Sequence, residues 1–442
     1  MKRLLVLAYF FPPIGGGGCQ RTLKLVRYLV PHGWESTVVT ARDADYWILD
    51  PSLLEEVPAS AEVLCVAGMT SLRMLRLFTQ RGGRIESPQA RRDPQTFRAL
   101  RRLQSWILIP DGYLPWAKAA GRAGAGRIER GGIDAVWTTS SPESAHLAGL
   151  AIKRRFHLPW VADFRDPWVG RVTYHPPTPW HDARHRSLER DVVHRADRVT
   201  VVSEAMAGLY RARYPDLPAD RFVTLPNGYD PDDWRRAERV AAPAAERGKG
   251  RFVLLHAGQL AHRPTARTLL VAVERVTAVD PRAASDLTVR FLGGNEEIDS
   301  EEIRSLTSSG VVELEPSRPH VEALAEMRRA QALVLLGHGG VADSLLYTGK
   351  IYEYLTSGRR VLGLLGPGPA ADLIRASSAG VVCGPEDAGR AAETIATWLA
   401  EWRRSGALPD VPRPADASSW ERPALAGRAA GVLDGLLKPT KN

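Results

Sequence analysis

The chain opens on a continuous apolar run that passes directly into prolines and glycines, LLVLAYFFPPIGGGG at residues 4–18. An apolar run of this kind is typical of a central parallel strand that is covered on both faces. From residue 19 to residue 30 the apolar positions recur at helical spacing, so we expect a helix directly after the glycines. Strand, glycine loop and helix in this order predict a doubly wound α/β sheet.

The same alternation continues in two series, which predicts two Rossmann-like domains in tandem. The first series has strands expected at 4–9, 36–40, 62–66, 133–138, 160–163, 198–202 and 222–225. The second has strands expected at 252–256, 287–292, 311–314, 332–336, 361–365 and 380–383. Two such sheets side by side would leave a ligand cleft between their carboxyl ends.

The predicted domain boundaries follow from composition. Residues 231–250 are polar, rich in Ala and Pro and follow the turn signal Asn227-Gly228. We therefore expect an N-terminal domain at 1–228 with a basic insertion at about 70–117, a linker at 229–250, a C-terminal domain at 251–405, and a last segment at 406–442 that ends in a helix at about 422–437.

Charge and cysteine content limit the function classes. Of the net charge of +9 in 442 residues, most comes from residues 71–104, where nine arginines face two acidic residues. Leucines and aromatic residues alternate with these arginines, as in helices on anionic membrane surfaces; a solvated insertion explains them equally well. Nucleic acid is disfavoured as a partner because no nucleic-acid motif accompanies the charge.

Location is predicted from the first residues and the cysteines. No small-residue cleavage site follows the apolar start, and no apolar run reaches the length of a membrane-spanning helix. Three widely spaced cysteines suit a reducing compartment and exclude a cysteine-based zinc site. We expect a cytoplasmic protein, with peripheral contact at the inner face of the membrane if the basic stretch binds lipid.

Two segments have residues suited to phosphate chemistry. Glycines at 15–18 let the backbone approach an anion at a helix N-terminus, although a flexible turn is the alternative. Farther along, Thr348 and Gly349 suit the opening of a helix whose N–H groups and Lys350 could hold a diphosphate. Glu353 lies one turn on and could accept both hydroxyls of a ribose; a solvated pair with Lys350 is the alternative.

In this order, the motifs of the chain resemble those of the family 4 glycosyltransferases with the GT-B fold, of the bacterial kind that makes surface polysaccharides and related glycosides. The motifs are YFFPP at 9–13 with its glycines, Pro110-Asp111 with Trp116, SSPESAH at 140–146, VADFRDPW at 161–168, PNGYD at 226–230, HAGQ at 256–259 and KIYEYL at 350–355. They extend over nearly the whole chain.

The resemblance implies a function for each domain. A nucleotide-sugar, most simply a UDP-sugar, would bind the C-terminal domain, and the acceptor would bind the N-terminal domain. The acceptor classes are a glycan, a lipid-linked sugar or a small natural product. Transfer would retain the anomeric configuration without a metal or other cofactor, and the last helix would cross back to the N-terminal domain.

Site residues are carried over by position. On the donor side the resemblance implies Gly15, Gly16, Gly17, Gly258, Gln259, Arg263, Lys350 and Glu353. Glu353 matches the second glutamate of the family's pair, whereas Leu345 stands where the first would fall. Gln259 replaces the first member of the usual basic pair, and Arg263 is the nearest cation to replace the second.

On the acceptor side the expected residues are Ser140, Ser141 and Arg165. We expect four catalytic residues: Asp163 and Asp166 would order the acceptor hydroxyl or the sugar, while Arg263 and Lys350 would stabilise charge on the leaving phosphate. An ordinary turn at Asp166-Pro167 and an Arg165–Asp163 ion pair are the structural alternatives.

Two alternatives remain open at the level of function, and a metal site is disfavoured. His181 and His185 have the i,i+4 spacing of zinc ligands, but the glutamate of a metalloprotease motif is missing, so no metal site is predicted. A nucleotide-sugar epimerase would share the architecture. A non-catalytic GT-B partner that activates another transferase is favoured by Leu345 and Gln259.

Overall fold

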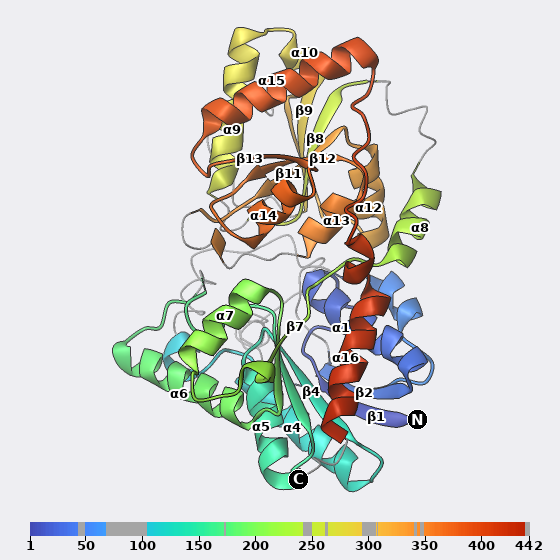
Figure 1. Ribbon diagram of the computed structural model, residues 1–442, viewed down its shortest axis with the longest axis vertical. Helices are drawn as coiled ribbons and strands as arrows, with labels where there is room; N and C mark the ends of the chain where they lie inside the picture. Colours follow the sequence, from blue (N-terminus) through green and yellow to red (C-terminus); the bar gives the residue numbers. More distant parts are fainter. Residues whose placement is uncertain are drawn as a thin grey trace, which may run out of the picture. The chain divides into compact units, whose positions relative to one another are not determined.

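The computed structural model describes residues 1–437 except for 43–48, 68–103, 172–173, 242–249, 261–263, 294–305, 307, 340–342 and 345–348. Two compact units make up the chain (Figure 1). Unit 1 comprises Met1–Pro226 with Pro423–Asn442, and unit 2 comprises Asn227–Arg422. Each unit contains one parallel sheet with flanking helices, so the predicted doubly wound α/β class is confirmed.

In unit 1 a seven-stranded sheet has the order β3-β2-β1-β4-β5-β6-β7. The first strand of the chain pairs in parallel on both edges, with Leu4 opposite Ser36 on one side and Ala135 on the other. The strands are β1 Lys2–Leu7, β2 Trp34–Ala41, β3 Glu62–Val66, β4 Ala135–Ser140, β5 Trp160–Phe164, β6 Arg198–Val201 and β7 Phe222–Thr224, and the helices are α1 Gly17–Leu29, α4 Leu114–Glu129, α5 Ser144–Phe156, α6 Pro179–Arg195, α7 Glu204–Arg213 and α16 Arg422–Leu437.

Unit 2 has a six-stranded sheet of order β10-β9-β8-β11-β12-β13. The strand order reverses beside β8, as it does beside β1 in unit 1, and ligands of open α/β sheets bind at such a reversal. The strands are β8 Phe252–Ala257, β9 Leu287–Leu292, β10 Val312–Glu315, β11 Ala332–Leu336, β12 Arg360–Leu364 and β13 Gly380–Cys383, and the helices are α8 Pro231–Val240, α9 Thr265–Val279, α10 Ala283–Asp286, α12 His320–Arg329, α13 Lys350–Thr356, α14 Pro369–Ala376 and α15 Ala388–Ser405.

Each predicted strand matches a strand of the structure to within two residues at either end. The predicted linker differs from the structure, because its first half forms the helix α8. Asp230 caps that helix by accepting a hydrogen bond from the N–H of Asp232, and Trp234 and Ala237 are buried in a core of unit 2. Residues 242–249 of the predicted linker and residues 68–103 of the predicted insertion lie outside the described residues.

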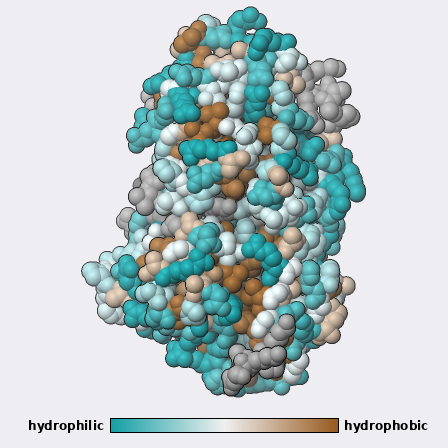
Figure 2. All heavy atoms as spheres, in the orientation of Figure 1, coloured by the Kyte–Doolittle hydropathy of each residue, from teal (hydrophilic) through white to brown (hydrophobic). Residues whose placement is uncertain are grey.

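The cores explain how the sheets are covered. One apolar cluster of unit 1 joins β1 residues such as Leu4 and Val6 to Ala429 and Leu433 of α16, so the last helix packs within unit 1. Unit 2 has two separate apolar clusters. On the face drawn in Figure 2, hydrophilic and intermediate residues predominate and hydrophobic residues gather in small patches. None of the helices that the structure describes combines the length and apolar character needed to cross a bilayer.

Packing between α5 and the sheet gives a test of the fold. A Cβ at Gly149 would lie 2.5 Å from Cγ2 of Thr138 and 2.8 Å from Cε2 of Trp160. We expect Gly149→Ala to lower the free energy of unfolding by about 1–3 kcal/mol through overpacking. At Gly126 of α4 a Cβ would meet no atom within 4 Å. Gly126→Ala should therefore raise the free energy of unfolding by up to about 1 kcal/mol. Urea denaturation measures both changes, and equal effects would contradict the described packing.

Candidate functional site

At the carboxyl edge of the unit 1 sheet, the glycine loop, the β4–α5 loop and Arg165 lie together. Helix α1 begins at Gly17 after Gly16, whose φ of 89° favours glycine, and no side chain caps it. A Cβ on Gly18 would lie 2.3 Å from Nη1 of Arg165, so glycine is what lets the guanidinium approach the first turn of α1. Arg165 also donates from Nε to the carbonyl oxygen of Ser140 and from Nη2 to that of Ser141, the latter at 2.6 Å. Three sequence-predicted segments thus meet at one cation.

Asp163 has a different environment from the one expected of a substrate-ordering carboxylate. Its side chain is 1% exposed, and both oxygens accept two hydrogen bonds. Arg21 donates to Oδ1 at 2.6 Å and to Oδ2 at 2.9 Å, Thr200 to Oδ1 at 2.7 Å and Thr139 to Oδ2 at 2.8 Å. Burial by itself would raise the pKa of Asp163, but Arg21 and the two hydroxyls outweigh it and hold the pKa below its usual range.

The predicted role of Asp163 is therefore corrected: it is a structural carboxylate that holds α1 to β4, β5 and β6. The predicted alternative of an Arg165–Asp163 pair is replaced by the Arg21–Asp163 pair. Asp166, three residues later, is exposed and remains a candidate for ordering an acceptor.

A buried polar cluster beside the β4–α5 loop was not predicted as a site. Asp111 accepts hydrogen bonds from the N–H and hydroxyl of Ser144 at 2.9 and 2.8 Å, which ties the loop at 110–113 to the start of α5. Glu143 pairs with Arg171 and accepts from Ser141. Burial, and then the charge of Glu143, raise the pKa of Asp111 to about 6. These residues lie in or next to two of the quoted motifs, and this position was the feature of the sequence that could have identified the cluster.

His146 lies in the same cluster and is fully buried. Its Nδ1 bonds the hydroxyl of Thr138 at 2.7 Å, and its ring packs on Phe164 with centroids 4.3 Å apart. Within the described part of the chain, Nε2 of His146 and Oγ of Ser140 have no hydrogen-bond partner. Burial lowers the pKa of His146 to about 4, so the ring is neutral near pH 7.

In unit 2, Lys350 at the start of α13 extends over the loop that follows β8. Gly258 in that loop has a φ of 140°, and a Cβ there would lie 1.6 Å from Nζ of Lys350. The N–H of Gly258 donates to the carbonyl oxygen of Leu292 at 2.7 Å, and the N–H of Ala257 donates to the hydroxyl of Tyr354 at 2.9 Å. Gly258, Gln259 and Lys350, predicted from segments far apart in sequence, are thus brought together at the carboxyl end of β8.

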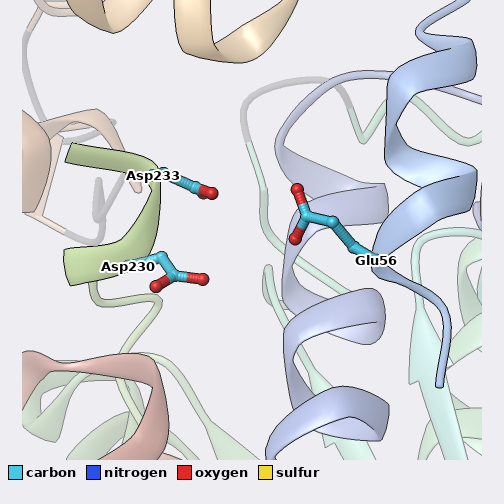
Figure 3. A group of neighbouring side chains, drawn as sticks. All are labelled: Glu56, Asp230 and Asp233. Carbon is cyan, nitrogen blue, oxygen red and sulfur yellow. The ribbon is translucent and has the colours of Figure 1, made fainter. Parts of the chain in front are cut away.

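Glu353, one turn along α13, is mostly buried. Its Oε1 lies 3.5 Å from Nε2 of His320, which is also 3.6 Å from Oδ2 of Asp233. Burial raises the pKa of Glu353, and the charges of His320 and Arg422 oppose that rise. Figure 3 shows Asp233 in the first turn of α8 and Asp230 at its start. Helix α8, predicted as linker, thus supplies a buried carboxylate beside the Glu353–His320 pair.

Figure 3 also labels Glu56, which belongs to unit 1 and ends a short 3-10 helix at Pro51–Glu56. Its Oε2 lies 2.5 Å from Nζ of Lys24 on α1, and both side chains are almost completely buried. This pair fixes the 3-10 helix to α1.

Two predicted residues are not described by the structure, and the two candidate zinc ligands have other partners. Arg263 and Leu345 lie outside the described residues. His181 uses Nδ1 on the hydroxyl of Thr178 and Nε2 on the carbonyl oxygen of Trp106, while Nδ1 of His185 accepts from Trp168. Both histidines therefore have protein partners at these nitrogens.

Comparisons with known proteins concern the family and the fold of the chain. Residues 16–228 match the family model of the glycosyl transferase 4-like domain. The fold is similar to that of a UDP-forming trehalose-phosphate synthase from Burkholderia xenovorans in complex with glucose-6-phosphate (TM-score 0.62, 11% identity, 98% of this chain and 100% of that chain). It is also similar to Anabaena HepE in complex with UDP (TM-score 0.58, 14% identity, 98% and 100%).

Residues 16–228 therefore form a glycosyl transferase 4-like domain, and the chain has the GT-B fold. Its fold is also similar to that of a putative UDP-N-acetylglucosamine 2-epimerase from Listeria monocytogenes (TM-score 0.55, 13% identity, 98% and 96%), so the architecture extends beyond transferases. No curated protein sequence matches the chain significantly. The predicted resemblance to the family 4 glycosyltransferases with the GT-B fold is therefore confirmed.

Replacing each aspartate with asparagine separates the structural role of Asp163 from that of Asp166. Asp163→Asn leaves Arg21 without its buried counter-charge, so we expect a loss of about 3–5 kcal/mol in the free energy of unfolding. Asp166→Asn, at an exposed position, should stay within about 0.5 kcal/mol of the wild type. Chemical denaturation measures both. An Asp163→Asn protein as stable as the wild type would contradict the structural role of this carboxylate.

His146 gives a pH-dependent test. Below about pH 6.5 the unfolded chain protonates this histidine while the native chain does not until about pH 4. As the pH falls from 6.5 to 4.5, the free energy of unfolding of the wild type should therefore decrease by about 2–3 kcal/mol more than that of His146→Leu. Asp111 works in the opposite direction, but it is present in both proteins and cancels in the comparison. Urea midpoints that change in parallel would contradict a neutral His146.

Proposed function

We propose that this glycosyltransferase moves a sugar from a nucleoside-diphosphate sugar, most simply a UDP-sugar, to an acceptor hydroxyl. The observation that carries the proposal is the placement of the Lys350 amine over the backbone at Gly258, on the helix that also carries Glu353. An ammonium group beside a glycine backbone suits a diphosphate, and a carboxylate one turn away suits the two hydroxyls of a ribose. A fold shared with HepE bound to UDP and with a UDP-forming synthase supports this donor class.

The proposed reaction requires no covalent bond between the sugar and the protein. The bond between the anomeric carbon and the diphosphate breaks, and its electron pair passes to the leaving phosphate. Lys350, with Arg263 and the amides of Gly15–Gly17 in the same proposed role, stabilises that negative charge. The acceptor oxygen forms the new bond to the anomeric carbon, and its proton passes to an oxygen of the leaving phosphate, so that the nucleoside diphosphate is the second product. Retention of configuration without a metal or other cofactor belongs to the same proposal.

On the acceptor side we propose Asp166, Ser141 and Arg165 as the residues that face the substrate, with Ser140 as part of their support. Arg165 is held by two carbonyl oxygens, so its guanidinium has a fixed position. The acceptor is a glycan, a lipid-linked sugar or a small natural product. We place this reaction in the cytoplasm, without nucleic acid as a partner.

A second function is favoured by specific residues. Leu345 in place of the first family glutamate and Gln259 in place of a basic residue fit a non-catalytic partner that activates another transferase. An epimerase, which shares the fold, would convert a nucleotide-sugar with no acceptor present.

Calorimetric titration with UDP, GDP, TDP and ADP tests the donor site. We expect one nucleotide to bind tightly and Lys350→Ala to weaken it by about tenfold to a hundredfold, since a charge-assisted hydrogen bond contributes about 1.5–3 kcal/mol. Glu353→Ala should weaken binding through the lost ribose contacts. Lys118→Ala, which removes an exposed lysine of unit 1, is the matched control and should leave the affinity unchanged.

The bound nucleotide then names the sugars to test in a transfer assay. Turnover of a donor in the absence of any acceptor would identify an epimerase. Failure to bind any of the four nucleotides would contradict the proposal and favour the non-catalytic partner.

A further inference from the structure

Three large apolar side chains are exposed side by side on unit 1. Trp106 is 56% exposed, Ile107 68% and Trp180 66%, and the two tryptophans are the exposed ones among those that the structure describes. Both indole rings contact the ring of the buried His181, with centroids 5.5 and 4.9 Å apart. His181 also bonds the carbonyl oxygen of Trp106. One buried histidine thus contacts two exposed indoles from separate segments, residues 104–107 and the first turn of α6.

The size of this surface argues against a stable protein interface. Three such side chains, exposed to this extent, offer roughly 400 Å² of apolar area, since an aromatic side chain buries about 150–250 Å² in full. A stable protein–protein interface buries about 800 Å² on each partner. Two indoles and an isoleucine are nevertheless sufficient to bind at the boundary between lipid headgroups and acyl chains, where tryptophan is enriched. Such binding also requires positive charge that attracts anionic lipids.

Positive charge is present beside these side chains. Arg184 follows Trp180 by one helical turn, is exposed, and forms no ion pair with any described residue. Arg186 pairs with Asp182, so that pair is neutral. In the sequence, the stretch at 71–104 with its nine arginines ends directly before Trp106.

We propose that Trp106, Ile107, Trp180 and Arg184, here called the tryptophan surface, dock unit 1 on an anionic lipid bilayer. The indoles and Ile107 enter the headgroup region, and Arg184 pairs with a lipid phosphate. The basic stretch alone predicts only an electrostatic contact; the tryptophan surface adds a defined apolar anchor. This proposal is independent of the donor site.

Co-sedimentation of the full chain with vesicles tests it. The vesicles contain phosphatidylcholine alone or phosphatidylcholine with one quarter phosphatidylglycerol. We expect the wild type to bind the anionic vesicles preferentially, and the double variant Trp106→Ser/Trp180→Ser to bind them roughly tenfold more weakly or worse. Val279→Ser, at an 87% exposed position of unit 2, removes a comparable exposed apolar side chain elsewhere and should bind as the wild type does.

Each other outcome overturns the proposal. Equal binding of the double variant and the wild type would assign lipid contact to the basic stretch alone, and no preference for anionic vesicles would remove the membrane. If sedimentation velocity shows a dimer that only the double variant dissociates, the tryptophan surface is an interface between copies.

A control shows that the double variant is folded. An unchanged urea midpoint and an unchanged nucleotide titration would make its loss of lipid binding specific.

Discussion

The buried ion pair between Arg21 and Asp163 is the interaction on which the unit 1 site depends. The guanidinium comes from α1, the carboxylate from β5, and the two hydroxyls that complete the carboxylate come from β4 and β6. Arg21 also donates to the carbonyl oxygen of Pro226, the last residue of the N-terminal segment of unit 1. Because the pair is removed from water, it is stable only while every one of these partners stays in place. Arg165 follows Asp163 by two residues and lies directly after β5, so the same pair helps to fix the position of this cation.

In both units a cationic side chain lies against a glycine where the strand order reverses. After β1 the guanidinium of Arg165 lies against Gly18, and after β8 the amine of Lys350 lies against Gly258. A side chain at either glycine would occupy the space of the cation. A glycine at each position therefore admits a positive charge from another segment to the place where parallel strands and helix N-termini already favour anions.

The sequence predicted the strands well because buried parallel strands are short apolar runs that their neighbours in the chain delimit. It missed α8 because that helix begins with a proline and acidic residues and buries only a narrow face around Trp234 and Ala237. The role of Asp163 could not be predicted because its partner Arg21 lies 142 residues away in the chain. One signal was available: Asp163 interrupts an apolar strand in the middle of the sheet, where a carboxylate has to be paired. Gly258 and Lys350 were assigned to one site by resemblance; their mutual fit depends on a contact between distant segments.

Burial also shapes how the proposed donor site would respond to a ligand. Glu353 has lost water, and its pKa is raised as a result, while His320 stands at 3.5 Å and Asp233 adds a second negative charge nearby. Two ribose hydroxyls would give this carboxylate the donors that burial removed, so binding would relieve part of the desolvation that it carries without the nucleotide. A solvated glutamate would gain less, because water already supplies its hydrogen bonds. The burial that makes Glu353 unfavourable as an isolated charge is therefore what would make it selective for a ligand with two adjacent hydroxyls.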